Sequence, residues 1–108
     1  MTTISKDNKL ATIINVFTVE PAQQQQLLEL LTQATESSVR HSPGWVSASL
    51  HRSLDGTKVA MYAQWRSVEE YREMRNHPDA LPYLLQAAAL GKFDPGIYEV
   101  VETYSHQD

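Results

Sequence analysis

The chain has 108 residues, of which 42% are hydrophobic, and a formal net charge of −4, so one domain with its own core is expected. It has no cysteine, which excludes disulfides and thiolate chemistry and favours a cytoplasmic location. The basic residues are scattered and no apolar run is long enough to span a membrane, so neither nucleic acid nor a membrane is an expected partner.

The first predicted element is a strand at residues 10–19, which is rich in β-branched side chains. Before it, residues 1–9 are polar and aperiodic, and we expect them to form a flexible N-terminal arm. Within the strand, Asn15 and Phe17 share a face with apolar neighbours. The Asn15 amide therefore needs hydrogen-bond partners, which are either nearby backbone and water or a bound ligand.

A helix is predicted from Pro21, which suits a first turn because it has no N–H group to leave unpaired. The apolar residues that follow recur at helical spacing, until a breaker sequence at residues 41–44 ends the helix.

The next strand, residues 45–53, alternates apolar and polar side chains. Its apolar face is expected to contain Val46, Ala48 and Leu50, and its polar face contains His51. On that face His51 is either an exposed strand residue or a base that acts near neutral pH.

The Asp55-Gly56 pair predicts a hairpin turn into a strand at residues 58–66. Both faces of this strand have apolar or amphipathic side chains, so one face should meet helices and the other a second sheet. Trp65 stands at the end of the strand. It is either a core residue or the wall of a pocket for an aromatic ligand.

A second helix is predicted after this strand, because Ser67 and Glu70 have the spacing of a capping box. This helix should turn Tyr71 and Met74 toward the core and Arg75 toward solvent. It ends at an Asn-His-Pro sequence.

The last part of the chain is predicted to be a helix at residues 79–90 and a strand at residues 97–104, followed by a tail at residues 105–108. Gly91 suits the C-terminal end of the helix. The apolar stripe of this helix consists of Leu81, Leu84, Leu85 and Ala88.

The predicted order of strand, helix, strand, strand, helix and strand is the ferredoxin-like split βαβ pattern. We therefore expect an α+β domain, residues 10–104, in which helices cover one face of a four-stranded antiparallel sheet. The other face would expose apolar residues such as Ile14 and Tyr62. A homodimer formed sheet against sheet would cover them.

Common catalytic and metal-binding patterns are missing from the sequence, including the Gly-rich phosphate loop, His-Glu-x-x-His and Gly-x-Ser-x-Gly. The four histidines do not fall at metal-ligand spacings, and no metal site is expected. The residues alone predict only a fold that has room for an aromatic-lined pocket.

Four stretches resemble the antibiotic biosynthesis monooxygenase family of the dimeric α+β barrel superfamily. They read Asn-Val-Phe-Thr-Val, Pro-Gly-Trp-Val-Ser-Ala-Ser-Leu-His-Arg-Ser-Leu-Asp-Gly, Tyr-Ala-Gln-Trp-Arg-Ser and Phe-Asp-Pro-Gly-Ile-Tyr-Glu-Val-Val. The resemblance implies a homodimeric monooxygenase that needs no cofactor and oxidises a small aromatic substrate, such as an anthrone, a quinol or a polyketide-like compound, with dioxygen. The deprotonated substrate would itself reduce oxygen, so the protein would position it and stabilise its anion.

The resemblance also implies roles for single residues. The expected catalytic residues are Asn15, Trp65 and His51. The expected substrate-binding residues are Tyr71, Met61, Phe17 and Leu85.

Two departures from the family favour an alternative function. Oxygenases of the family commonly have an Asn where this chain has Met61, and some have an arginine near the position of Leu85. The alternative is a non-catalytic dimer that binds a hydrophobic ligand. A further alternative is haem binding and degradation, with His77 as the haem ligand.

Overall fold

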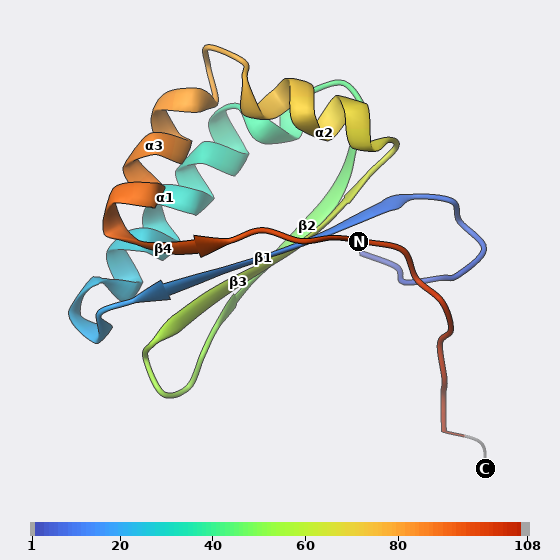
Figure 1. Cartoon of the computed structure of the whole chain (residues 1–108), viewed down its shortest axis with the longest axis horizontal. Coiled ribbons are helices and arrows are strands. Elements are labelled where there is room, and N and C mark those ends of the chain that lie inside the picture. The colour runs from blue at the N-terminus through green and yellow to red at the C-terminus, as the bar shows by residue number, and fades with distance from the viewer. Residues whose placement is uncertain (1, 107–108) are drawn as a thin grey trace.

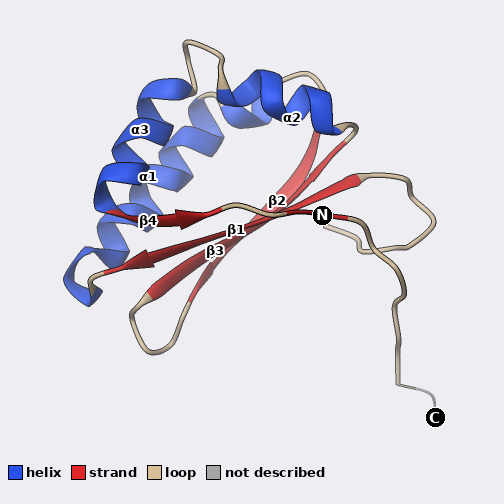
Figure 2. Ribbon diagram, viewed as in Figure 1, coloured by secondary structure: helices blue, strands red, loops and turns tan. Residues whose placement is uncertain are grey.

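The computed structural model describes residues 2–106, which form one antiparallel sheet with the helices on a single face (Figures 1 and 2). The strands are β1 (Ala11–Val19), β2 (Trp45–Arg52), β3 (Lys58–Trp65), β4 (Gly91–Asp94) and β5 (Ile97–Tyr98). The helices are α1 (Gln24–Ser37), α2 (Val68–Arg75) and α3 (Leu81–Leu90), with 3₁₀ turns at Pro21–Gln23 and Val39–His41. The sheet order is β2-β3-β1-β4, and β5 pairs with β1. The α+β, ferredoxin-like prediction is confirmed.

The central strands β1 and β3 provide the floor on which the helices pack. In their antiparallel register Asn15 lies directly opposite Met61, and Phe17 lies opposite Val59. Alternate residues on both strands face the helices. Among them Ile13 and Trp65 are each 1% exposed, so the strand face that contains Trp65 is the face covered by helices.

The β2–β3 hairpin turns at Gly56, whose φ of +83° is in the left-handed region that glycine adopts without strain. The Asp55 carboxylate accepts hydrogen bonds from the Thr57 hydroxyl, the Thr57 N–H and the Ser53 hydroxyl, and these lower the pKa of Asp55 to about 2. The buried Gln24 side chain donates to two carbonyl oxygens of the hairpin, at 3.1 and 2.9 Å, and thereby holds α1 against it.

Helix α2 begins at the predicted cap. The Ser67 hydroxyl accepts a hydrogen bond from the Glu70 N–H at 3.2 Å and donates one to the Glu70 carboxylate at 2.9 Å. The Glu70 carboxylate also accepts from Arg66. The pKa of Glu70 is lowered, first by Arg66 and then by Ser67. These contacts set the start of the helix and therefore the direction of its later side chains.

The C-terminal strand differs from the prediction of a strand at residues 97–104. Strand β4 begins at Gly91 and pairs with the end of β1, while β5 is only two residues long. Gly91 follows the last residue of α3, as predicted, but its extended φ of −160° is not the left-handed conformation of a helix-ending glycine, and it also begins β4. A Cβ at Gly91 would lie 2.6 Å from the Thr18 carbonyl oxygen and 2.6 Å from the Val19 side chain. Glycine therefore permits the close approach of β4 to β1.

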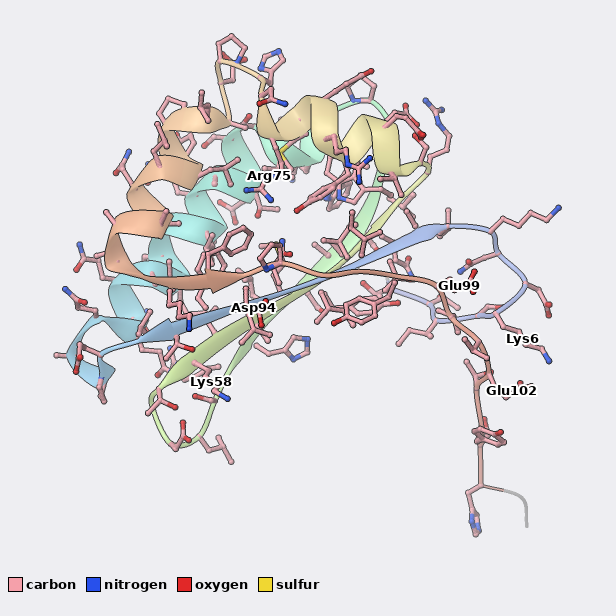
Figure 3. The ribbon with its side chains drawn as sticks, viewed as in Figure 1. Lys6, Lys58, Arg75, Asp94, Glu99 and Glu102 are labelled. Carbon is pink, nitrogen blue, oxygen red and sulfur yellow. The ribbon has the colours of Figure 1, made fainter. Side chains whose placement is uncertain are left out.

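The terminal segments lie side by side at one end of the sheet (Figure 3). The Gln64 amide donates to the Thr3 carbonyl oxygen at 2.6 Å, and Lys6 pairs with Glu102 at 3.0 Å. The flexibility of the arm and the domain limits stay predictions; residue 1 and residues 107–108 lie outside the described residues. None of the helices within residues 2–106 has the length and apolar character that crossing a membrane needs.

We predict that Gly91→Val lowers the free energy of unfolding by about 1–3 kcal/mol, because the added side chain must push β4 away from β1. Urea denaturation followed by circular dichroism measures this change. The matched control is Lys92→Ala at the next, exposed position, which should change stability by less than about 0.5 kcal/mol. Equal midpoints for Gly91→Val and the unsubstituted protein would contradict the prediction.

Candidate active site

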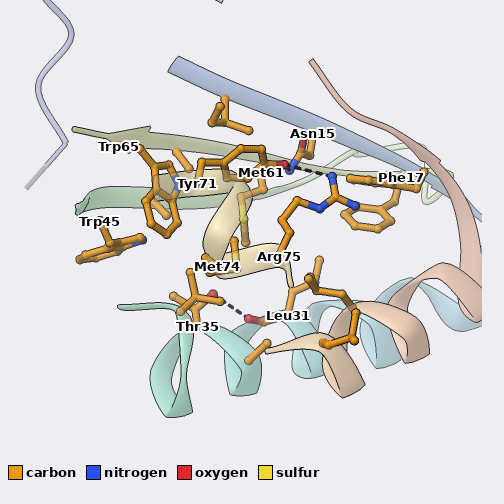
Figure 4. Close-up of a pocket in the computed structure, with 18 of the residues that line it drawn as sticks. Asn15, Phe17, Leu31, Thr35, Trp45, Met61, Trp65, Tyr71, Met74 and Arg75 are labelled. Carbon is orange, nitrogen blue, oxygen red and sulfur yellow. Dashed lines mark hydrogen bonds between the residues drawn. The ribbon is translucent and has the colours of Figure 1, made fainter. Parts of the chain in front are cut away.

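A cavity of about 180 Å³ lies between the sheet and the helices (Figure 4). Residues of β1, β2, β3 and β4 and of all three helices α1, α2 and α3 line it. Most of the lining side chains are aliphatic or aromatic, so a polar group that reaches the cavity is in surroundings where its interactions are strong.

One wall of the cavity is the apolar stripe predicted for α3. The lining residues on that helix are Leu81, Leu84, Leu85 and Ala88. Leu85 is 62% exposed, whereas Ala87, outside the predicted stripe, is 1% exposed. Ala87 therefore packs α3 into the core, and the stripe faces the cavity and its mouth.

Three polar side chains meet inside the cavity (Figure 4). The Asn15 Nδ2 atom donates to the Tyr71 hydroxyl oxygen at 3.4 Å, and Arg75 Nη1 donates to the same oxygen at 3.3 Å. Asn15 and Tyr71 are 9% and 5% exposed. The second polar atom of the amide, Asn15 Oδ1, is buried and has no partner within residues 2–106. A hydrogen-bond donor on a ligand would explain this unpaired acceptor.

Arg75 is the one charged residue among the described residues that line the cavity. In Figure 3 its side chain lies between the helices and the sheet. The guanidinium carbon is 4.9 Å from the centroid of the Phe93 ring and 5.9 Å from that of Tyr71, distances at which a cation is stabilised by aromatic faces. No carboxylate in the described part of the chain forms an ion pair with it.

The prediction that Arg75 points to solvent is therefore wrong. Arg75 is four residues after Tyr71, and residues at that spacing share a helix face. This spacing in the sequence could therefore have identified Arg75 as a neighbour of Tyr71. An amphipathic pattern assigns a cation to the outer face and cannot show that the inner face meets a cavity.

Two tryptophans, Trp65 and Trp45, also line the cavity. Trp65 packs edge-on against Tyr71, with ring centroids 5.8 Å apart. Trp45 lies opposite Trp65 across the β2–β3 pair. Its indole Nε1 atom is buried without a hydrogen-bond partner among the described residues, and Trp45 lines the same cavity as Asn15.

The position of Trp45 corrects the alternation predicted for its strand. The register of β2 shifts between Trp45 and Ser47, and such an irregularity reverses the side on which the preceding residues lie. Trp45 consequently lines the cavity. Val46, expected on the apolar face, is 42% exposed.

The structure brings together six of the seven residues expected at the site. Those that line the cavity are Asn15, Phe17, Met61, Trp65, Tyr71 and Leu85. His51 is the exception, since it lies exposed on the other face of the sheet, with its Nε2 atom 2.8 Å from the Ser49 hydroxyl. The haem-ligand candidate His77 is outside the cavity as well, 58% exposed by its side chain. Within residues 2–106 no cluster of three His, Asp or Glu residues has metal-binding geometry.

Comparisons with known proteins agree with this architecture. A family model described as antibiotic biosynthesis monooxygenase matches residues 10–83. The tetracenomycin-F1 monooxygenase of Streptomyces glaucescens is 40% identical over 104 residues, which are 96% of this chain and 93% of that protein.

Two solved structures are similar over nearly the whole chain. The monooxygenase from the gene ActVA-Orf6 of Streptomyces coelicolor, in complex with nanaomycin D, is 29% identical with a TM-score of 0.80, over 94% of this chain and 96% of that one. SnoaB, a cofactor-independent oxygenase from Streptomyces nogalater, is 23% identical with a TM-score of 0.76, over 91% and 99% of the two chains. The second likeness supports the fold.

We predict that Asn15→Leu raises the free energy of unfolding by about 1 kcal/mol, because it replaces a buried, half-paired amide with an apolar group of similar size. The urea midpoint measures the change. Asn15→Ala is the comparison variant, since it removes the amide but leaves a void and should not stabilise. A lower midpoint for Asn15→Leu would mean that the amide supports the fold and would argue against a ligand-facing role.

Proposed function

Since the chain belongs to the antibiotic biosynthesis monooxygenase family, we propose that it is a monooxygenase that oxidises a polycyclic aromatic, polyketide-type substrate with dioxygen. The observation that carries the proposal is the meeting of Asn15, Tyr71 and Arg75 at one point of a mainly apolar cavity. Such an arrangement binds a flat apolar molecule and stabilises negative charge on one of its oxygens.

The proposed chemistry balances for an anthrone-type substrate without a further reductant. Loss of one proton from the ring CH₂ group gives an enolate, which passes one electron to dioxygen. The carbon radical and superoxide combine, and the peroxide anion takes up a proton. Loss of the second ring proton then cleaves the O–O bond and leaves a ketone and hydroxide, which is protonated to water. The substrate supplies four electrons, and one oxygen atom enters the product.

In this proposal the protein stabilises the enolate. The Tyr71 oxygen accepts hydrogen bonds from Asn15 and Arg75, so its own proton remains for the enolate oxygen, and a hydroxyl that accepts two such bonds is a stronger donor. Arg75 adds positive charge in apolar surroundings, where charge interactions are strong. No carboxylate or histidine is among the described lining residues, and the substrate proton therefore passes to water.

Other residues of the cavity supply the two groups that are missing at Met61 and Leu85. Met61 occupies the position of the family's amide, and Asn15 lies directly opposite it on the neighbouring strand. Leu85 occupies the region of an arginine in some members, and Arg75 supplies a guanidinium from α2. These counterparts favour catalysis over the non-catalytic alternative.

We also propose a homodimer formed through the open face of the sheet. Apolar residues on that face, such as Ile14 and Tyr62, are only partly covered within the chain, and a second copy would bury them. His51 would then lie at the interface. The cytoplasmic location and the absence of nucleic-acid and membrane partners stay predictions.

Oxygen consumption by metal-stripped protein tests the proposed function, with a panel of anthrones and quinols as substrates. We expect one dioxygen consumed per anthrone converted to quinone, at a rate well above that of the blank. A rate equal to the blank for every compound would overturn the proposal.

The non-catalytic alternative retains one observation in its favour, the apolar Met61 in the cavity. If the natural protein and Met61→Asn both fail to consume oxygen but bind a polycyclic quinone, the ligand-binding function is supported. If only Met61→Asn consumes oxygen, the fold is competent and the natural chain lacks the amide that it needs.

We predict that Arg75→Met lowers kcat about a hundredfold, the typical loss when one group that stabilises a developing oxyanion is removed. Arg75→Lys should retain part of the activity, because it keeps the charge but not the planar fork of donors. The matched control is Arg72→Met on the exposed face of the same helix, which should leave kcat unchanged. Similar kcat values for Arg75→Met and Arg72→Met would argue against Arg75 as a stabilising group.

A further inference from the structure

We propose that Trp45 and Asn15 together determine how the substrate is oriented in the cavity. This inference rests on the proposed function and specifies the class of substrate. The Trp45 indole N–H donates to a carbonyl oxygen at the remote end of the ring system. Asn15 Oδ1 accepts a hydrogen bond from a phenolic hydroxyl near the reacting carbon. The structure thereby specifies a substrate with a hydroxyl at one end and a carbonyl at the other.

The first support is the pair of unsatisfied atoms. Buried side-chain atoms nearly always have a hydrogen-bond partner, so each exception needs an explanation. Within residues 2–106 the buried side-chain atoms without one are Asn15 Oδ1 and Trp45 Nε1, and both residues line the same cavity. One is an acceptor and the other a donor. A ligand that satisfies both must therefore present a donor and an acceptor, in a fixed order along its length.

The second support is the separation of the two residues in the sheet. Asn15 is the cross-strand partner of Met61, and Trp45 is the partner of Trp65. At a rise of about 3.4 Å per residue, the positions of Met61 and Trp65 on β3 are roughly 14 Å apart. The two residues thus belong to opposite ends of the cavity. A linear system of several fused rings spans such a length, whereas a single phenol ring does not.

The third support is the shape of the floor between the two ends. Ala48 and Ala63 are cross-strand partners and both line the cavity. Their short side chains leave a shallow, flat surface, while Trp65 and Tyr71 provide aromatic rings beside it. Flat ring systems pack well against such surfaces. These features favour a planar polycyclic substrate over a flexible chain of similar length.

The decisive variant is Trp45→Phe, which keeps an aromatic ring and removes the N–H group. It is assayed with two anthrone-type substrates that differ only in a carbonyl at the end remote from the reacting carbon. We expect KM to rise about tenfold for the substrate with the carbonyl, the effect of one lost hydrogen bond, with kcat little changed. For the substrate without the carbonyl, neither constant should change.

Val46→Ala at the neighbouring exposed position is the matched control and should behave like the natural protein. Equal increases of KM for both substrates would show that Trp45 only packs against the rings, and unchanged constants would show that it makes no contact; either result overturns the inference. Anaerobic titration with the corresponding quinones measures Kd, and it compares Trp45→Phe with the natural protein for ligands with and without the remote carbonyl. It decides the role of Trp45 even if the protein consumes no oxygen, so the two proposals fail separately.

A second variant tests the floor if Trp45→Phe does not fold. Ala48→Leu fills the flat surface between the two ends, and it should raise KM for fused-ring substrates without affecting a single-ring quinol. An equal rise in KM for the fused-ring substrates and the single-ring quinol would contradict an elongated binding mode.

Discussion

The antiparallel register of β1 and β3 is the constraint on which the cavity depends. Because side chains alternate between the faces of a sheet, a slip of one residue would move Asn15 and Phe17 to the open face. The register sets Asn15 beside Met61 and within hydrogen-bond distance of Tyr71. Gly91 extends the same constraint by letting β4 approach β1 closely, and β4 in turn places Phe93 beneath the Arg75 guanidinium.

The electrostatics of the cavity follow from what surrounds its single cation. Arg75 is held by two aromatic rings and one hydroxyl oxygen, and these contacts orient the guanidinium without neutralising it. A carboxylate partner would stabilise the cation more, but it would also compete with an anionic ligand. Guanidinium has five N–H donors, and one of them is used in the hydrogen bonds described for this side chain. The site is therefore arranged in advance for negative charge on a ligand.

Local patterns in the sequence predicted the order of the elements, the hairpin and the cap of α2, while the resemblance to the family implied most of the residues that meet in the cavity. They failed where the outcome depended on distant packing. The alternation along β2 placed Val46 on the apolar face, yet Val46 is 42% exposed, because the register shift between Trp45 and Ser47 is not visible in the sequence. The same alternation correctly separated His51 from Leu50, but it could not show which face the helices cover. The apolar and polar alternation of residues 97–104 suggested a strand, of which only residues 97–98 pair with β1 in the described chain.

Helix α3 shows the general reason for such failures. Its apolar stripe has the spacing of a core-facing surface, yet Leu81 and Leu85 are 38% and 62% exposed. Hydrophobic periodicity records which side chains avoid water, and it does not distinguish burial by the protein from burial by a ligand. An aromatic molecule in the cavity would cover apolar side chains that the chain itself leaves exposed. Because it would bind only the folded state, it would also stabilise the fold. The apolar character of this helix is then a property of the binding site as much as of the fold.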